Sequence, residues 1–278
     1  MTAPNSSGSD FSGSDFSGPN LSGPSLSGLD LSPAPAPAPP SKRIIRHGLI
    51  EARLLIRNGE QLLLALVIPL AILVAGRFAG ASLEGLDVLG PSVLALAVWS
   101  SAFTSVAIST AFERRYGVLE RLATTPLGKP GLLAGKALAV ILIILGQLVI
   151  LTSAALALGW RPRFTPVSAL LAAVLVILAT VTFVCLALLL AGRLRAESTL
   201  GLANLIYVVL LIGGALLIPL QRYPTVLQPL IGALPTAALG EGLRAAANGQ
   251  LLGWSVVVLL AWLVAAGLAA WKGFRWTS

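Results

Sequence analysis

Long apolar segments recur through the chain from residue 61 to residue 271. Several of them are long enough for a helix to cross a hydrocarbon core of about 30 Å. Hydrophobic residues make up 56% of the chain and charged residues only 11%, which lies outside the range of ordinary soluble domains. A membrane offers no water to exposed backbone groups, so these segments must be helical. The sequence therefore predicts an all-α membrane protein with one helical bundle.

The apolar pattern predicts six transmembrane helices. Their approximate limits are 61–78, 89–112, 132–158, 167–191, 199–220 and 251–271. The stretch 222–249 contains Pro224, Pro229, Pro235 and several glycines, so it is too broken for a normal span. It is also too apolar for an ordinary loop. We expect a re-entrant segment before the last helix, covered by protein rather than by lipid.

The first 41 residues have a different composition and are expected to form a separate cytoplasmic tail. Residues 7–31 repeat with a period of five and resemble pentapeptide repeats. A solenoid of so few repeats cannot bury its apolar face, so a disordered Ser/Gly/Pro-rich tail with degenerate repeats is the preferred interpretation. The Pro-Ala alternation that follows is typical of an extended spacer. The helical domain is predicted over residues 42–278.

The segment just before the first predicted span is amphipathic. Apolar residues recur at three- and four-residue steps and arginines occupy the other face: Ile45, Leu49, Ala52 and Ile56 against Arg46, Arg53 and Arg57. This pattern predicts an N-terminal interfacial helix on the cytoplasmic leaflet. His47, the only histidine, is expected to lie at the surface of this helix without a chemical role.

Basic residues indicate the orientation of the bundle. With a cytoplasmic N-terminus, five of the 19 Lys and Arg residues fall in outer segments and the other 14 fall inside; the outer five are Arg77, Arg161, Arg163, Arg222 and Arg244. This positive-inside bias predicts that both termini are cytoplasmic. The net charge of +8 does not indicate nucleic-acid binding, because the basic residues lie at the ends of apolar segments.

Side chains suited to catalysis or metal binding are scarce. Cys185 is the only cysteine, and it lies inside an apolar segment. An integral membrane enzyme is therefore disfavoured. An ion-coupled secondary transporter would ordinarily carry acidic groups within its spans, and the six predicted spans contain none. That transporter and a purely structural scaffold stay as alternatives to the function considered next.

The loop between the second and third predicted spans, residues 113–126, carries most of the functional signal. It is rich in charge and has helical spacing, with an apolar stripe of Tyr116, Leu119, Leu122 and Ala123. Pro126 is expected to end the helix. So short a helix is not stable alone and needs the membrane surface, its neighbours or a groove on another protein.

This loop resembles the pattern of ABC-2-type permeases, the membrane subunits of bacterial ABC exporters. In that pattern Glu-Arg precedes a Gly, then Leu-Glu-x-Leu, then Ser or Thr before Pro. The matching positions are Glu113, Arg114, Gly117, Leu119, Glu120, Leu122, Thr125 and Pro126. The six spans, the amphipathic helix and the interrupted segment, with its Leu234-Pro235-Thr236 sequence, agree with the same family over roughly residues 42–278.

The resemblance implies that residues 113–126, Tyr116 included, form a coupling helix that fits a cleft on a separate ATPase subunit. Glu113 and Glu120 would pair with basic residues there. The alternative is a solvated loop helix whose charges only set the topology. The resemblance also implies a second permease subunit, identical or paralogous. It further implies export across a bacterial cell membrane, with membrane lipids as neighbours. The largely apolar pathway favours a hydrophobic, amphiphilic or lipid-linked substrate over small ions, although related permeases also export polysaccharide.

The nucleotide machinery is absent from the chain's own sequence. A phosphate-binding loop requires Gly-x-x-x-x-Gly-Lys-Ser/Thr, but Gly128-Lys129 is followed by Pro130, and Ala123 stands where the first Gly belongs. The chain is therefore not expected to hydrolyse ATP or to bind a cofactor. ATP and Mg would be bound by the partner ATPase.

One charged pair is expected in the interrupted segment. Glu241 and Arg244 are three residues apart, so on a helix they share one face and can pair near the membrane. This pair is a candidate for the outer mouth of a transport path. A purely structural pair is the alternative interpretation.

Overall fold

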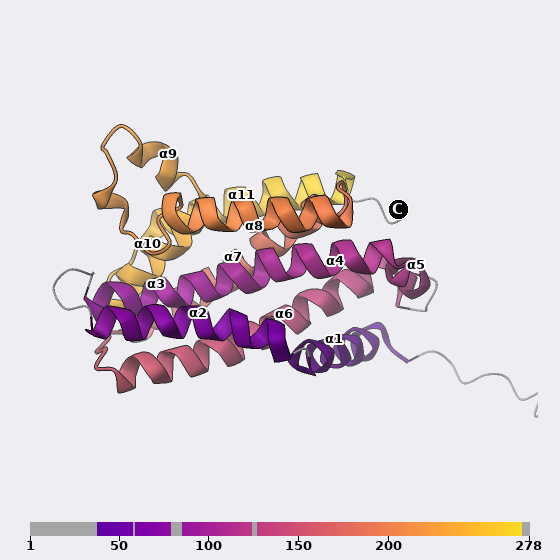
Figure 1. Ribbon diagram of the computed structural model, residues 1–278, viewed down its shortest axis with the longest axis horizontal. Coiled ribbons are helices and arrows are strands. Elements are labelled where there is room, and N and C mark those ends of the chain that lie inside the picture. Colours follow the sequence, from indigo (N-terminus) through magenta and orange to yellow (C-terminus); the bar gives the residue numbers. More distant parts are fainter. Residues whose placement is uncertain (1–37, 58, 79–84, 124–126, 274–278) are drawn as a thin grey trace, which may run out of the picture. The chain divides into compact units, whose positions relative to one another are not determined.

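The computed structural model describes residues 38–57, 59–78, 85–123 and 127–273, and all regular elements among them are helices (Figure 1). The predicted repeat tail lies outside the described residues. In chain order the elements are α1 (Pro40–Arg57), α2 (Gly59–Phe78), α3 (Leu86–Trp99), the π-helix η3 (Ser100–Ser105), α4 (Val106–Arg115), α5 (Val118–Ala123), α6 (Gly128–Ala157), α7 (Pro166–Ala191), α8 (Ala196–Gly213), the 3-10 helix η4 (Leu220–Arg222), α9 (Gln228–Gly232), α10 (Pro235–Ala247) and α11 (Gly253–Gly273).

The predicted amphipathic helix is present as α1. Ile45, Leu49 and Ile56 of its apolar face are exposed, and Ala52 is buried. The helix packs against the beginning of α6 (Figure 1). The two helices approach closely at Gly48, where an added β-carbon would lie 2.9 Å from the Leu138 side chain. The absence of a side chain at this glycine permits the approach.

Among the described residues, five helices are long and apolar enough to cross a membrane. They are Leu86–Arg115, Ala134–Ala157, Pro166–Ala191, Ala196–Gly213 and Gly253–Gly273. The predicted span 61–78 lies within α2, which contains a shorter apolar helix, Leu66–Phe78. The count of six spans therefore stays a prediction.

The start of α7 illustrates how local sequence sets a helix boundary. Thr165 Oγ1 accepts a hydrogen bond from the Ser168 amide at 3.1 Å, and Ser168 Oγ accepts one from the Thr165 amide at 2.9 Å. This reciprocal capping box satisfies two amides that a helix start leaves unpaired. Pro166 occupies the first turn, where its missing N–H costs nothing.

The predicted fifth span, 199–220, ends earlier in the structure. Helix α8 stops at Gly213, and the chain then runs irregularly to η4. Ala215 has a φ of 52°, which is unfavourable for a residue with a β-carbon. The Arg244 guanidinium donates hydrogen bonds to the carbonyls of Ala215 and Leu216, at 2.7 and 2.9 Å, and so holds the backbone in this conformation. Hydropathy alone could not show this break, because the segment after Gly213 remains apolar.

The predicted interrupted segment, 222–249, holds the end of η4 and two helices, α9 and α10. Nearly all of α10 is buried, and it packs against α3, α7 and α11. It lies near the start of α3, away from α5 (Figure 1). Coverage of this segment by protein is thus confirmed for α10, whereas its re-entrant path through a membrane stays a prediction.

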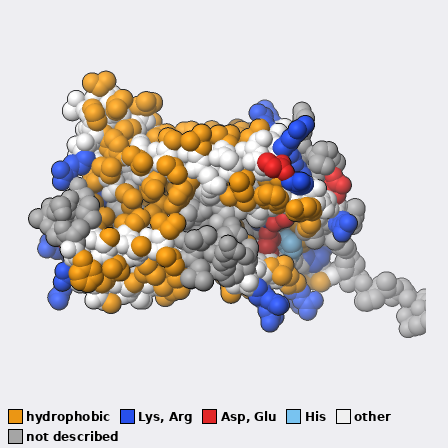
Figure 2. Space-filling view, viewed as in Figure 1, with side chains coloured by type: hydrophobic (Ala, Val, Ile, Leu, Met, Phe, Trp, Pro, Cys, Tyr) orange, Lys and Arg blue, Asp and Glu red, His pale blue; other side chains and the backbone are white. Residues whose placement is uncertain are grey.

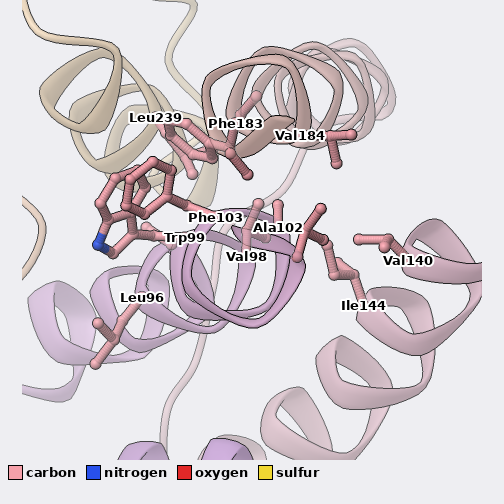
Figure 3. Close-up of a cluster of buried hydrophobic side chains, with 14 of the residues drawn as sticks. Leu96, Val98, Trp99, Ala102, Phe103, Val140, Ile144, Phe183, Val184 and Leu239 are labelled. Carbon is pink, nitrogen blue, oxygen red and sulfur yellow. The ribbon is translucent and has the colours of Figure 1, made fainter. Parts of the chain in front are cut away.

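The core lies around the α3–η3–α4 run. Trp99 stacks on Phe103 with ring centroids 4.4 Å apart and meets the edge of Phe183 at 4.8 Å. Figure 3 shows these rings between α3–η3 and α7, with Val140 and Ile144 of α6 reaching the same run from another side. The π-helical turn lies at the centre of this packing; such turns occur frequently at functional sites.

Charged side chains gather toward the ends of the helices. Figure 2 shows hydrophobic side chains over the middle of the visible face and Lys or Arg side chains toward both ends, with acidic ones at the end where α5 lies. This distribution is the one expected of helices whose middle sections face hydrocarbon.

Candidate functional site

The candidate site begins with the turn between α4 and α5. The Tyr116 amide donates to the Phe112 carbonyl at 2.9 Å and the Gly117 amide to the Arg114 carbonyl at 3.1 Å, which closes the end of α4. Gly117 has a φ of 68°, a conformation that glycine adopts without steric penalty. The structure thus differs from the predicted uninterrupted helix over 113–126: a glycine turn divides the segment into the end of α4 and the six-residue α5.

The predicted apolar stripe is also divided by this turn. Leu119 is buried with 2% of its surface exposed, whereas Tyr116 is 65% exposed. Glu120 is exposed on α5. The Leu122 side chain, Thr125 and Pro126 lie outside the described residues. Helix α5 is therefore held to the bundle through Leu119, while Tyr116 and Glu120 remain open to a partner.

Glu113, predicted to face an ATPase, is bound within the chain. Lys136 Nζ lies 2.7 Å from Glu113 Oε2 and 2.9 Å from Glu51 Oε1. His47 Nε2 lies 3.2 Å from Glu51 Oε2. The exposed fraction of the Lys136 side chain is only 6%, so the ammonium needs both carboxylates in place of water. These four side chains, here called the Lys136 cluster, join α1, α4 and α6.

The end of α4 is also tied to the connection between α7 and α8. The Arg114 guanidinium donates to the Leu194 carbonyl, and Arg115 pairs with Glu197. Both members of the Arg115–Glu197 pair are at least half exposed, so this ion pair is expected to contribute little to stability. Together with the Lys136 cluster, these contacts place the α4–α5 turn at a junction of α1, α6, α7 and α8.

A small cavity of about 50 Å³ with polar and apolar walls adjoins the Lys136 cluster. Its polar lining comes from Glu51, Lys136, Ser101, Ser105, Ser109 and Gln147. Ser101 Oγ donates to Gln147 Oε1 at 2.6 Å, which links η3 to α6. A cavity of this size has room for a few water molecules, each of which needs polar partners. The cavity thus brings together polar residues of two predicted spans, Ser105 and Ser109 from 89–112 and Gln147 from 132–158.

Glu241 and Arg244 form the predicted pair. Arg244 Nη2 lies 2.8 Å from Glu241 Oε1, and both side chains are buried. The guanidinium also donates to Ser92 Oγ of α3 at 2.7 Å, in addition to the carbonyls of Ala215 and Leu216. Glu241 Oε1 accepts from the Leu220 amide at 2.7 Å. The pair therefore fastens the break after α8 to α3 and α10.

Lys136 and Glu51 were not predicted from the sequence to have a role. A signal was present, because Lys136 lies within the predicted span 132–158, where a lysine requires a partner. The partner could not be identified from spacing, since Glu51 and Glu113 lie on two other helices. Within the described residues, no group of three or more His, Cys, Asp and Glu side chains is arranged to hold a metal ion.

Comparison with protein families identifies the bundle. A family model described as ABC-2 family transporter protein matches residues 80–272, which is more than half of the chain. No curated protein matches the chain. The matched range runs from the start of α3 to the end of α11, and it includes the α4–α5 turn and the Glu241–Arg244 pair. The chain therefore belongs to the ABC-2 transporter family.

Proposed function

We propose that this chain is the membrane-spanning permease subunit of an ATP-driven exporter. A separate ABC ATPase, which membership of the family implies as a partner, binds ATP and Mg and drives the cycle. The observation that carries the proposal is α5, a six-residue helix next to the α4–α5 turn. It is anchored by the buried Leu119 and presents the charged side chain of Glu120 outward.

The contacts around α5 supply a path for mechanical coupling. A push on α5 acts through the Gly117 turn on α4, whose last turn carries Glu113 and Arg114. Glu113 connects this movement to α6 and α1 through Lys136, and Arg114 connects it to the α7–α8 connection. Rigid helices with ion-paired ends transmit displacement because their packed interiors do not deform continuously.

The sidedness of the basic segments supports a cytoplasmic position for α5. Arg114 and Arg115 contact the α7–α8 connection, and Arg193 of that connection lies against the end of α11. These segments, all predicted to be inside, thus meet at one end of the bundle. The Arg163 amide donates to the Ala247 carbonyl, among segments predicted to be outside. An orientation with α5 and both termini in the cytoplasm agrees with the positive-inside rule.

The proposed exporter also has a second permease subunit, a substrate class and an outer mouth. An ABC exporter works with two membrane halves, so a second permease, identical or paralogous, assembles with this chain. Helix α8 supplies a candidate contact surface, since Leu205, Val209 and Ile212 are all more than half exposed. The largely apolar helices favour a hydrophobic, amphiphilic or lipid-linked substrate. The Glu241–Arg244 pair fixes the irregular segment at the outer mouth of its path.

The experiment that tests this function is reconstitution in lipid vesicles. The chain is purified together with the ABC ATPase subunit that accompanies it, and ATP hydrolysis is measured for wild type, Glu120→Lys and Asp87→Lys. Asp87 is a matched control because it is an exposed acid in the first turn of α3, at the opposite end of the Leu86–Arg115 helix. We expect Glu120→Lys to lose assembly or coupled hydrolysis while Asp87→Lys retains both. Unchanged coupling in Glu120→Lys would contradict the proposed docking role.

A further inference from the structure

A second hollow lies on the other side of the core from the Lys136 cluster. This groove has a volume of about 430 Å³, within the range of ligand pockets, roughly 300–1,000 Å³. Its walls come from α3–η3, α7, α8 and α11, together with the residues where α10 begins. Its lining side chains are hydrophobic along the whole length except at one end, where Arg193 lies.

Aromatic side chains form part of the groove wall. Trp99 and Phe103, stacked on each other, contribute from α3–η3. Trp262 contributes from α11, and its indole N–H donates to the Ala233 carbonyl at 2.8 Å, so its orientation is fixed. The Trp262 N–H is thus satisfied within the protein, whereas the Trp99 indole N–H is the one polar ring group of this wall that is buried without a hydrogen-bond partner in the described part of the chain. Such a wall suits a hydrocarbon chain rather than a polar ligand.

The mouth of the groove carries positive charge. Arg193 follows the end of α7, and Arg195 comes two residues later. The end of α11 lies against the same guanidinium, since a β-carbon on Gly273 would be 2.7 Å from Arg193 Nη2, and Lys272 precedes that glycine. The acid closest along the chain, Glu197, is paired with Arg115. The exposed Arg193 is therefore available to an anionic group outside the protein.

The length of the groove is comparable to the thickness of the hydrocarbon region of one lipid leaflet. Along α7, the lining residues from Arg193 to Leu186 cover seven residues, or about 10 Å of helix. Along α11, Trp262 lies eleven residues, or about 16 Å, from Gly273, the residue that lies against Arg193. Half the hydrocarbon thickness of a bilayer is about 15 Å. A lipid whose phosphate meets Arg193 would thus lay its acyl chain against Trp99, Phe103 and Trp262.

We propose that this groove binds one anionic phospholipid, with the headgroup phosphate on Arg193 and an acyl chain along the α7–α8 walls. The charge at one end and the apolar lining beyond it match the two parts of such a lipid. Basic pockets between membrane helices on the cytoplasmic side recognise anionic headgroups in this way. Arginine is suited to the phosphate because its planar guanidinium offers two parallel donors.

The test is lipid binding to the purified full chain, measured by native mass spectrometry with phosphatidylglycerol and phosphatidylcholine as probes. Arg193→Gln removes the phosphate ligand, and Arg163→Gln is the matched control before the start of α7. Leu190→Trp fills the groove from α7; Ile206→Trp fills it from α8 and serves if the first variant does not fold. This measurement needs no ATPase partner, so it is independent of the proposed transport function.

We expect Arg193→Gln to weaken phosphatidylglycerol binding about fivefold, as the loss of one cation near a membrane surface predicts. Arg163→Gln should leave it unchanged, and either tryptophan variant should abolish it. Equal affinities in the two arginine variants would overturn the site. Retention of phosphatidylglycerol by a groove-filling variant would also overturn the site. The same holds if a groove-filling variant loses the mass of a second copy of the chain and not that of a lipid.

Discussion

Lys136 Nζ of α6 lies 2.7 Å from Glu113 Oε2 at the end of α4. The same ammonium binds Glu51 of α1, so one buried cation connects three helices. The contact lies immediately before the turn that leads into α5, and it accounts for a carboxylate that sequence reasoning assigned to an external partner. The α4–α5 turn is therefore supported from inside the bundle, and the proposed contact with an ATPase would rest on other residues.

The Lys136 cluster predicts an ordered series of stabilities. Lys136→Met leaves two carboxylates without their cation, and removing one partner from a buried ion pair costs about 3–5 kcal/mol. Glu113→Gln leaves Lys136 bound to Glu51 and should lower stability less. Thermal unfolding of the purified variants in detergent measures both. The account would be wrong if Glu113→Gln lowered the stability more than Lys136→Met.

Arg244 is expected to tolerate no replacement, because its guanidinium binds four groups at once. Arg244→Leu leaves Glu241 without its cation and two backbone carbonyls without their donor, which should destabilise the protein by about 3–5 kcal/mol. Arg244→Lys supplies a point charge in place of a planar fork and should rescue only part of this loss. Ser92→Ala, which removes one of the four partners, should cost about 1–2 kcal/mol. Equal stability of Arg244→Lys and wild type would show that the fork geometry is unimportant.

Gly240 is closely surrounded and Gly146 is not, so their alanine variants test the packing of α10 against the irregular segment after α8. A β-carbon on Gly240 would lie 2.5 Å from the Ala215 carbonyl oxygen, so Gly240→Ala should cost about 1–3 kcal/mol through overpacking. Gly146 in α6 has no atom within 4 Å of its added β-carbon, so Gly146→Ala should keep or slightly raise stability. Thermal unfolding distinguishes them. A stable Gly240→Ala variant would contradict the close contact between α10 and the irregular segment.

The turn at Gly117 predicts a graded effect on coupling. Its φ of 68° is tolerated by asparagine but costs a branched residue roughly 1–2 kcal/mol, and no neighbouring atom crowds an added β-carbon. Gly117→Asn should therefore retain ATPase coupling in reconstituted vesicles, whereas Gly117→Val should impair it. Because both changes enter open space, similar losses in the two variants would show that backbone conformation at this turn is not what matters.

Much of the bundle could be predicted from the sequence because hydrocarbon imposes strong rules. Helices had to form wherever apolar segments were long, and the predicted span 167–191 agrees with α7, Pro166–Ala191, because the apolar run has the same limits. The pairing of Glu241 with Arg244 followed from helical spacing alone. Each of these inferences needed only neighbours along the chain.

What the sequence could not show depends on contacts between distant segments. The end of α8 at Gly213 is fixed by Arg244, which is 29 residues from Ala215 along the chain. The partners of Lys136 lie 85 and 23 residues away, on α1 and α4. The division of the predicted coupling helix at Gly117 was more accessible, since a glycine in so short a segment is a common helix end.

The central claim is that α5 docks on a separate ATPase, and site-specific cross-linking tests it most directly. Cys185 is the only cysteine, so Cys185→Ser provides a background into which Glu120→Cys or Asp87→Cys is introduced. Each variant, labelled with a photoreactive maleimide, is illuminated in membranes that contain the accompanying ABC ATPase. We predict a cross-link to the ATPase from position 120 and none from position 87. An assembled complex that gives no cross-link from position 120, or gives one from position 87, would contradict the account.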